Sequence, residues 1–334
     1  MALPGASGNP SPDTSTAVGL TRSAPLVGIS FKVASTLIFS VMVVALKIAS
    51  ERVPIGEVVF ARNFFGMWPV LFMVAMRGEL MIAFRTDRPW GHVGRSAVGI
   101  TAMIFSFTAF SLLPLPDATA IGFATPLMVV VLAFLVLGER VRIYRWSAVL
   151  IGFLGIIIIL SPHLGDGDFN GAETVGALCG AAAALFAAMA MIFVRRLCET
   201  ERTSTIVTWF AGLASLLSLV TIPLGWLIPS QAWVVPDLET SGLLVLVGLS
   251  GGVGQILLTQ SYRYADASTI APFDYANMIW AVALGYFLFA EVPVPEVLIG
   301  AAIVIAAGVF VIYREHRLGL DRTRNRRAST PSRS

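Results

Sequence analysis

The chain has 334 residues, of which 56% are hydrophobic and only 13% are charged, with a mean hydropathy of +0.81 and a net charge of +3. Soluble domains carry about 25% charged residues, so this composition excludes an ordinary soluble protein and indicates a membrane protein. The small positive charge does not indicate nucleic-acid binding, because the arginines follow the membrane topology, and the two cysteines, Cys179 and Cys198, give no disulfide framework.

The first 25 residues are rich in Pro, Gly, Ser and Thr and lack the apolar core of a signal peptide, so we expect a disordered tail at 1–25. Ten apolar runs follow, each close to the 20 or so residues that cross the hydrocarbon. They are about 26–50, 55–76, 94–113, 117–137, 143–162, 173–194, 204–228, 241–262, 268–290 and 293–313. Hydrophobicity on all sides favours α-helices over the alternating strands of a barrel. A basic tail, 314–334, closes the chain.

The arginines are distributed unequally between the two sides of the membrane. Nineteen of them fall in the two tails, at the end of the eighth run, or in and around the loops after the second, fourth and sixth runs, whereas the opposite loops hold Arg52 alone. By the positive-inside rule, both termini are predicted to be cytoplasmic. We therefore expect an all-α, multi-pass protein of the cell inner (cytoplasmic) membrane.

Three short patterns occur in the same order in both halves of the chain. "PDATAI" at 116–121 is echoed by "ADASTI" at 265–270, Glu139 and Glu291 each follow a Gly or an Ala, and "VLIG" begins at residue 149 and again at residue 297. Five helices per half would make the second half cross the membrane inverted. Inverted repeats are typical of secondary transporters, which bind their substrate between the halves near the midplane.

The stretch 116–162, with a weaker copy at 264–313, resembles the paired EamA domains of the drug/metabolite transporter superfamily. "FARNFFG" at 60–66 resembles the second helix of that family. We therefore expect a first EamA repeat at 26–162 and a second at 173–313. The resemblance implies ten helices, a central cavity, and ATP-independent export or uptake of small organic solutes without a cofactor.

The second copy departs from this pattern inside a predicted helix. "PFDYANMIW" begins at residue 272, where the first copy has "TPLMVVVL", so polar residues replace apolar ones. Its candidate substrate-binding residues are Asp274, Tyr275, Asn277 and Trp280. Asp274 and Lys32 both lie roughly 9 Å from the predicted inner face. They could neutralise each other, or Asp274 could bind protons or a substrate amine, so both are candidate coupling residues.

Three more polar residues lie inside predicted helices and complete the candidate substrate site. Arg62 is roughly 10 Å from the outer end of the second helix, followed by Asn63, and Gln255 lies in the eighth helix. Arg62 could bind the carbonyls at a neighbouring helix end or a substrate carboxylate. The lysines at 32 and 47 could instead snorkel to an interface, where Lys47 could meet Glu57.

Two prolines lie at comparable places in the two halves. Pro126 interrupts the fourth predicted helix and Pro272 the ninth. Interrupted helices at matching positions of two repeats often mark a transporter's binding site.

A different class of protein is suggested by "GLSGG" at 248–252, which fits the G-x-S-x-G pattern of serine hydrolases and raises an intramembrane protease with Ser250 as nucleophile. A serine nucleophile needs a base within hydrogen-bond reach. The histidines, His92, His163 and His316, are predicted in loops, tails or helix edges, so close-packed glycines explain the pattern better. No zinc-ligand set and no phosphate-binding loop is recognisable, so neither an enzyme, a metal site nor an ATP-driven pump is expected.

The sequence thus predicts a secondary-active carrier of small organic metabolites. An amino acid or related amphipathic solute, exported, is the first expectation. The alternative is uptake of a vitamin, nucleoside-like or S-adenosylmethionine-like solute, and a passive channel is a further class. The expected partners are the solute, membrane lipid and, as a candidate coupling ion, the proton. Nucleic acid is not expected, and the carrier could be a monomer or a homodimer.

Overall fold

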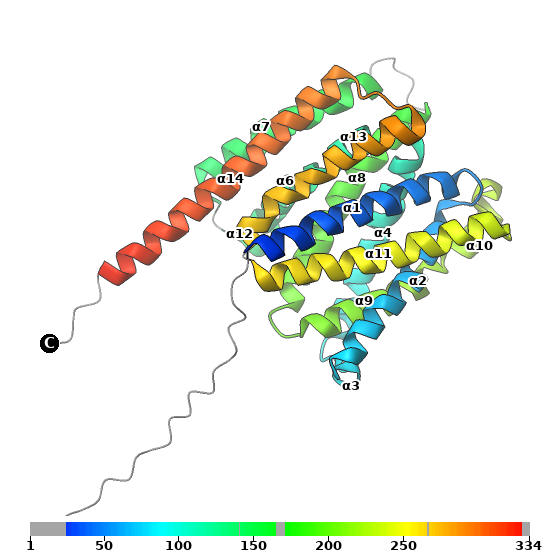
Figure 1. Cartoon of the computed structure of the whole chain (residues 1–334), viewed down its shortest axis with the longest axis horizontal. Coiled ribbons are helices and arrows are strands. Elements are labelled where there is room, and N and C mark those ends of the chain that lie inside the picture. Colours follow the sequence, from blue (N-terminus) through cyan, green and yellow to red (C-terminus); the bar gives the residue numbers. More distant parts are fainter. Residues whose placement is uncertain (1–24, 140, 165–170, 266, 329–334) are drawn as a thin grey trace, which may run out of the picture.

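The computed structural model describes residues 25–139, 141–164, 171–265 and 267–328, and within these ranges it contains helices and no strand. The longer helices are α1 (Pro25–Ser50), α2 (Ile55–Met76), α4 (Pro89–Leu112), α7 (Ile143–Leu164), α8 (Ala172–Leu197), α11 (Leu238–Tyr264) and α14 (Pro295–Ala328). The shorter elements are α3 (Leu80–Ala83), α5 (Leu115–Gly122), α6 (Ala124–Leu137), α9 (Thr203–Ser218), α10 (Thr221–Leu227), η1 (Pro229–Gln231), α12 (Ala267–Ile270), η2 (Ala271–Tyr275) and α13 (Ala276–Phe289). Figure 1 shows them as a bundle with α7 and α14 side by side along one edge.

The two predicted tails have different outcomes. Almost all of the N-terminal tail lies outside the described residues. At the other end, the predicted boundary at residue 313 does not coincide with the end of a helix, because α14 continues to Ala328. Its last turns project away from the bundle in Figure 1.

Nine helical stretches of the described chain are apolar and long enough to cross a bilayer. They correspond to nine of the ten predicted runs, with α5 and α6 counted as one stretch and α9 and α10 as another. The remaining run, 268–290, is divided into α12, η2 and α13, and the longest of these helices has 14 residues. Pro272 contributes to the break, because proline has no N–H and its ring crowds the preceding turn. Ten crossings therefore stay a prediction.

In both halves of the chain, a helix is broken just after the repeated pattern Asp-Ala-x-x-Ile, which begins at residues 117 and 266. In the first half, α5 ends at Gly122 and α6 begins at Ala124, so Pro126 lies in the first turn of a new helix, where a missing N–H is tolerated. In the second half, η2 contains Pro272 and separates α12 from α13. Each of these prolines thus lies within a few residues of a helix break.

Contacts between helices follow the repeat. The pair α1–α11 has its counterpart in α8–α4, α2–α11 in α9–α4, and α1–α13 in α8–α6. The pairs α2–α9 and α7–α14 each join equivalent helices of the two halves. This is the pattern that two similar five-helix units give when they pack around an approximate two-fold axis.

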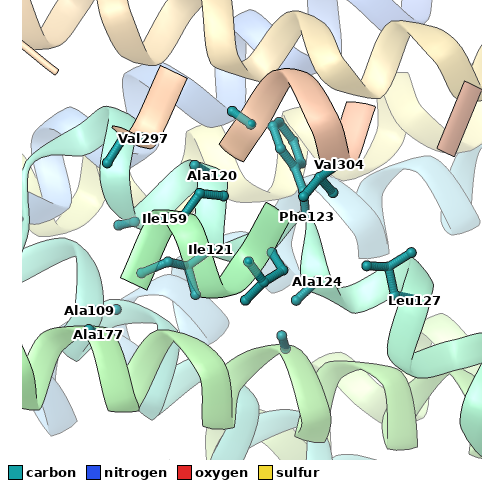
Figure 2. Close-up of a cluster of buried hydrophobic side chains, with 14 of the residues drawn as sticks. Ala109, Ala120, Ile121, Phe123, Ala124, Leu127, Ile159, Ala177, Val297 and Val304 are labelled. Atoms are coloured by element: carbon teal, nitrogen blue, oxygen red, sulfur yellow. The ribbon is translucent and has the colours of Figure 1, made fainter. Parts of the chain in front are cut away.

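The apolar interior forms two clusters. One surrounds the break between α5 and α6, where Ile121 and Phe123 join Ile159 of α7 and Val304 of α14 in one group of side chains (Figure 2). The other lies among α1, α2, α4, α9 and α11 and includes Leu46. The first cluster draws on both repeats, so it fixes the interrupted helix against the second half of the chain.

Close approach between α2 and α11 depends on glycine. A Cβ on Gly252 would lie 2.6 Å from the carbonyl oxygen of Gly66, and a Cβ on Gly248 would lie 2.7 Å from that of Ala61. Neither position can hold a side chain without moving the helices apart. The predicted role of this G-x-x-x-G pair in close helix packing is confirmed.

Glu201, between α8 and α9, closes the loop that precedes α4. Its carboxylate accepts hydrogen bonds from the Thr86 hydroxyl (2.6 Å) and from the backbone N–H groups of Asp87 (3.0 Å) and Arg88 (3.3 Å). Burial opposes the charge of Glu201, but these bonds and the nearby His92 favour it, and the pKa of this carboxyl is held below its usual value. We call these hydrogen bonds to Glu201 the loop clasp; they tie the first half of the chain to the second.

Candidate functional site

Three adjoining cavities run through the bundle. The largest, about 540 Å³, lies among α2, α4, α6, α8, α9 and α11. A second, about 350 Å³, shares Arg62 and Gln255 with it. A third, about 300 Å³, shares Gly122 with the second and reaches α1, α5 and α13. Together they form a series from Arg195 near the end of α8 to Leu115 at the start of α5.

Four of the predicted site residues line these cavities. Arg62, Asn63 and Gln255 line the largest, and Asn277 lines the third. Arg62 donates from Nη1 to Oδ1 of Asn63 (3.1 Å), and the buried Asn63 donates from Nδ2 to the carbonyl of Val59 (2.8 Å). The amide of Asn63 therefore holds the guanidinium of Arg62 in place.

The other predicted site residues line none of these three cavities: Asp274, Tyr275 and Trp280. Trp280 donates its indole N–H to the hydroxyl of Thr36 on α1 (3.1 Å). The ring of Tyr275 meets Phe123 edge-on, with the centroids 5.2 Å apart. These side chains hold η2 and α13 against α1 and the α5–α6 break.

Asp274 forms an ion pair with Lys32, whose Nζ lies 2.5 Å from Oδ1. The Lys32 side chain is only 2% exposed, so it does not snorkel, whereas Asp274 is 49% exposed. Of the alternatives left open by the sequence, mutual neutralisation is present in the geometry. A role for Asp274 with protons or substrate stays a prediction.

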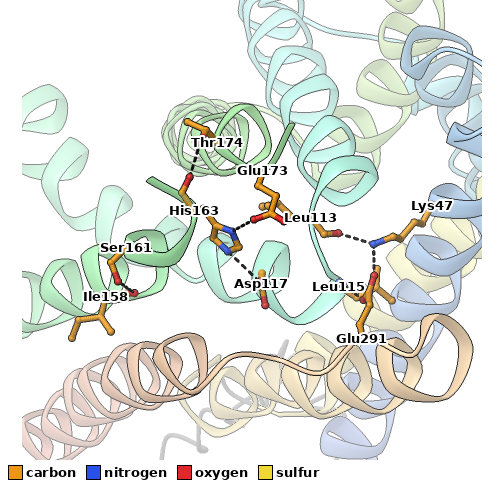
Figure 3. A network of polar contacts seen from close by, with 10 residues as sticks. All are labelled: Lys47, Leu113, Leu115, Asp117, Ile158, Ser161, His163, Glu173, Thr174 and Glu291. Atoms are coloured by element: carbon orange, nitrogen blue, oxygen red, sulfur yellow. Dashed lines mark hydrogen bonds and ion pairs between the residues drawn. The ribbon is translucent and has the colours of Figure 1, made fainter. Parts of the chain in front are cut away.

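Lys47 and Glu291 form a second ion pair at the opposite end of α1 (Figure 3). Their charged atoms lie 2.5 Å apart, and each side chain is 13% exposed. Lys47 also donates to the carbonyl of Leu113 (2.6 Å), and Glu291 accepts from the backbone N–H of Leu115 (2.7 Å). The predicted pairing of Lys47 with Glu57 was wrong, because it rested on nearness in the chain and Glu291 is 244 residues away. The position of Lys47 at a membrane interface stays a prediction.

Next to this pair, His163 bridges two acids (Figure 3). Its Nε2 lies 3.1 Å from Asp117 and its Nδ1 lies 3.3 Å from Glu173, while its carbonyl accepts from the Thr174 hydroxyl (2.6 Å). Asp117 and His163 are 4% and 5% exposed. This buried contact joins α5, α7 and α8. This contact was not predicted, although the predicted helices 117–137 and 143–162 put Asp117 and His163 at the same membrane face.

The end of α8 carries the counterpart of the Lys47–Glu291 pair. Arg195 follows Lys47 by 148 residues, and Glu139, like Glu291, follows a left-handed residue that ends an apolar helix (φ 65° and 56°). Arg195 and Glu139 form an ion pair of 3.2 Å, but their side chains are 51% and 43% exposed. Equivalent helix ends of the two halves are thus joined by two ion pairs, one partly buried and one exposed.

Arg95, at the start of the predicted run 94–113 and counted above with the arginines in and around the loops, is a cavity residue. It lines the two larger cavities, and its guanidinium carbon lies 3.5 Å from the ring centroid of Phe210. Its Nε and Nη1 are buried without an acceptor among the described residues. Pro89, a favoured first residue of a helix, could have shown that the helix begins before Arg95.

Ser250 shows no sign of activation as a nucleophile. It is buried, and its hydroxyl donates to the carbonyls of Leu246 and Val247 in its own helix. Packing between helices accounts for such a serine. The described residues contain no group of three or more His, Cys, Asp and Glu side chains that could hold a metal ion.

Known proteins similar to this chain are transporters. It is 30% identical over 295 residues to the S-adenosylmethionine uptake transporter of Rickettsia prowazekii (strain Madrid E), covering 87% of this chain and 94% of the relative. It is 30% identical to the pseudopaline exporter CntI of Pseudomonas aeruginosa (strain UCBPP-PA14), covering 85% and 93%. It is 29% identical to the riboflavin transporter of Rhizobium johnstonii, covering 90% and 96%.

The fold and the repeat are shared more widely. One solved crystal structure superposes with a TM-score of 0.60 at 21% identity, covering 88% of this chain and 98% of the other. The model of the EamA-like transporter family matches twice, at residues 26–161 and 174–314, which are the two halves found from the repeated patterns. With its apolar helices and two matching repeats, this chain is a multi-pass membrane protein that belongs to the EamA-like transporter family.

Proposed function

We propose that the chain is a secondary-active carrier of small organic metabolites in the cytoplasmic membrane, working by alternating access between two inverted repeats. One observation carries this proposal. The series of cavities ends under the partly buried Lys47–Glu291 pair at one face and widens beside the exposed Arg195–Glu139 pair at the other. A bundle closed at one face and open at the other is one half of an alternating-access cycle.

Ten crossings fit this proposal better than nine. If the interrupted segment of α12, η2 and α13 did not cross, the two termini would lie on opposite sides of the membrane. The arginines of the C-terminal tail would then lie opposite those of the other basic loops, against the positive-inside rule. Broken helices at bilayer depth are tolerated where they are buried in protein or line a cavity, as in transporters. On this topology both termini are cytoplasmic and the structure is open to the cytoplasm.

The two ion pairs act as alternating gates. Lys47–Glu291 closes the outer face in this structure, with both partners only 13% exposed and held by the backbone of residues 113 and 115. In the outward-open state this pair separates, and the Arg195–Glu139 pair, which is formed but exposed in this structure, becomes buried as the inner face closes. Because the partners are equivalent residues of the repeats, the free energy lost at one gate is offset at the other.

The solute is a small amphipathic metabolite, such as an amino acid or its derivative, and export is the first candidate direction. A cavity of about 540 Å³ falls within the range of small-molecule sites. Uptake of a vitamin, nucleoside-like or S-adenosylmethionine-like solute is the second candidate, favoured by relatives named for uptake of S-adenosylmethionine and for riboflavin. The relative named as a pseudopaline exporter favours the first direction.

Counterflow in proteoliposomes tests the carrier function. Liposomes with purified protein are filled with a ¹³C-labelled bacterial metabolite extract and placed in the same extract without label. Mass spectrometry then follows labelled solutes that leave in exchange for unlabelled ones. A carrier exchanges a few solutes saturably and faster than it releases them into solute-free buffer. Equal release of all small solutes would identify a pore, and no release beyond protein-free liposomes would refute the proposal.

The direction of transport needs living cells. Untargeted metabolomics should compare an overexpressing strain with a deletion strain. Solutes depleted inside and enriched outside on overexpression support export, and the reverse pattern supports uptake. Reporter tags on both termini should be inaccessible from outside intact cells, and an accessible terminus would refute the proposed topology.

A further inference from the structure

The charged side chains around the largest of the three adjoining cavities are all of one sign. Its lining includes Arg62, Arg95 and Arg195, and the described residues around it include no aspartate, glutamate or lysine. The second cavity repeats Arg62 and Arg95, again without an acid in its described lining. Arg195 is paired with Glu139, but within the described ranges Arg62 and Arg95 form no ion pair.

Arg62 is held in a fixed position facing these cavities. Its Nη1 is hydrogen-bonded to Asn63, whose amide is anchored to the α2 backbone. Gly251 of α11 leaves room for the side chain, because a Cβ there would lie 3.3 Å from Nε of Arg62. The one polar partner described for this guanidinium is a neutral amide, which leaves its charge uncompensated.

Arg95 is held in a comparable way from α4. Its guanidinium carbon lies over the ring of Phe210, 3.5 Å from the centroid, and a Cβ on Gly99 would lie 2.8 Å from Nη1, so this glycine makes space for it. Two of its nitrogens are buried without an acceptor. Stacking on an aromatic ring stabilises a cation by about 0.5–2 kcal/mol, much less than the cost of removing a charge from water.

An unpaired charge inside a membrane protein is costly, and two charges of the same sign at one cavity add repulsion. We infer that the transported solute supplies the missing charge: it carries an oxyanion, a carboxylate or a phosphate, that binds between Arg62 and Arg95. This inference rests on the proposed carrier function and names its substrate class. The planar guanidinium donates two parallel N–H bonds to such a group, and Gln255 offers neutral hydrogen bonds to the rest of the solute.

Selectivity follows from the same geometry. An amide or ester analogue of the solute would enter the cavity but leave both charges uncompensated, and sites built for a polar group reject analogues that lack it. Zwitterionic amino acids fit this requirement through their carboxylate. Neutral vitamins and nucleosides without an acidic group do not.

The ¹³C counterflow experiment tests the inference when it is read by solute chemistry. Labelled solutes exchanged by the wild-type carrier should contain a carboxylate or a phosphate. Arg62→Gln and Arg95→Gln should each lower their exchange by about tenfold or more, the equivalent of one charge-assisted interaction. Arg142→Gln is the matched control, because Arg142 is exposed near the predicted cytoplasmic face and lines none of the three cavities. Its exchange rate should equal that of the wild type.

Folding is controlled by comparing equal amounts of monodisperse protein and by two conservative variants. Arg62→Lys and Arg95→Lys keep the charge and should retain more exchange than the glutamine variants. Exchange of solutes without an acidic group would overturn the inference and leave the carrier function standing. Exchange that is equally fast in folded Arg62→Gln and Arg95→Gln proteins would do the same. If the wild type exchanges nothing, the carrier function fails and the inference fails with it.

Discussion

The ion pair between Lys32 and Asp274 gives a prediction in which the two single variants differ strongly. Asp274→Asn leaves the ammonium of Lys32 unpaired, and that side chain is only 2% exposed. Removing one partner of a buried ion pair costs about 3–5 kcal/mol. Lys32→Met instead leaves a carboxylate that is 49% exposed, so the cost falls toward the value of about 1 kcal/mol for exposed pairs. The double variant removes both charges and should resemble Lys32→Met.

The assay is thermal unfolding of the purified proteins in one detergent, followed by size-exclusion chromatography. At about 2 °C per kcal/mol, Asp274→Asn should lower the unfolding temperature by about 6–10 °C and Lys32→Met by about 2 °C. Adding Lys32→Met to Asp274→Asn should recover most of the loss. Equal stability of wild type and Asp274→Asn, or a larger loss in Lys32→Met, would refute the reasoning.

The same variants separate a structural from a coupling role. If Asp274 carries protons, the double variant should be stable but should no longer respond to a pH gradient, while exchange without a gradient persists. If the pair is only structural, the stable double variant should transport as the wild type does. Gradient-driven transport by Asp274→Asn in proteoliposomes would exclude the proton role.

Three further predictions concern the gate, the loop clasp and helix packing. Glu291→Gln should open the outer gate. A cysteine placed at Thr119, in the third cavity, should then be labelled about tenfold faster by an impermeant thiol reagent added outside. Unchanged labelling would contradict the gate. The lowered pKa of Glu201 stabilises the folded protein: this contribution is fully present above the ordinary glutamate pKa of about 4.3 and is lost as the pH falls through the lowered pKa. Because Glu201→Gln removes it, the unfolding temperature of the variant should fall less than that of the wild type between about pH 5 and pH 3. An unchanged pH profile would exclude this clasp. Gly252→Val should prevent close packing of α2 and α11 and lower the free energy of unfolding by several kcal/mol. Gly242→Ala is the control, because nothing lies within 4 Å of a Cβ there, and it should be neutral or stabilising. Equal thermal stability of the two variants would contradict this packing.

Most of the fold could be predicted from local sequence. A lipid-exposed helix must be apolar over about 20 residues, and a proline inside such a run weakens it, so nine of the crossing helices and both breaks were predictable. The repeat was visible in three short patterns because equivalent helices keep equivalent ends. Counting residues along the predicted helices placed Lys32 and Asp274 at similar depths in the membrane, and in the structure they form an ion pair.

The sequence alone determined the number of apolar helices to within one, the two repeats and the transporter class, because these follow from hydropathy and pattern along the chain. Only the tertiary structure decided which charges meet. Lys47 pairs with Glu291 rather than Glu57, and Arg95 lines a cavity, because helices far apart in sequence pack side by side. Charge compensation in a membrane depends on distance in space, and distance in space is set by how the ten runs pack against one another.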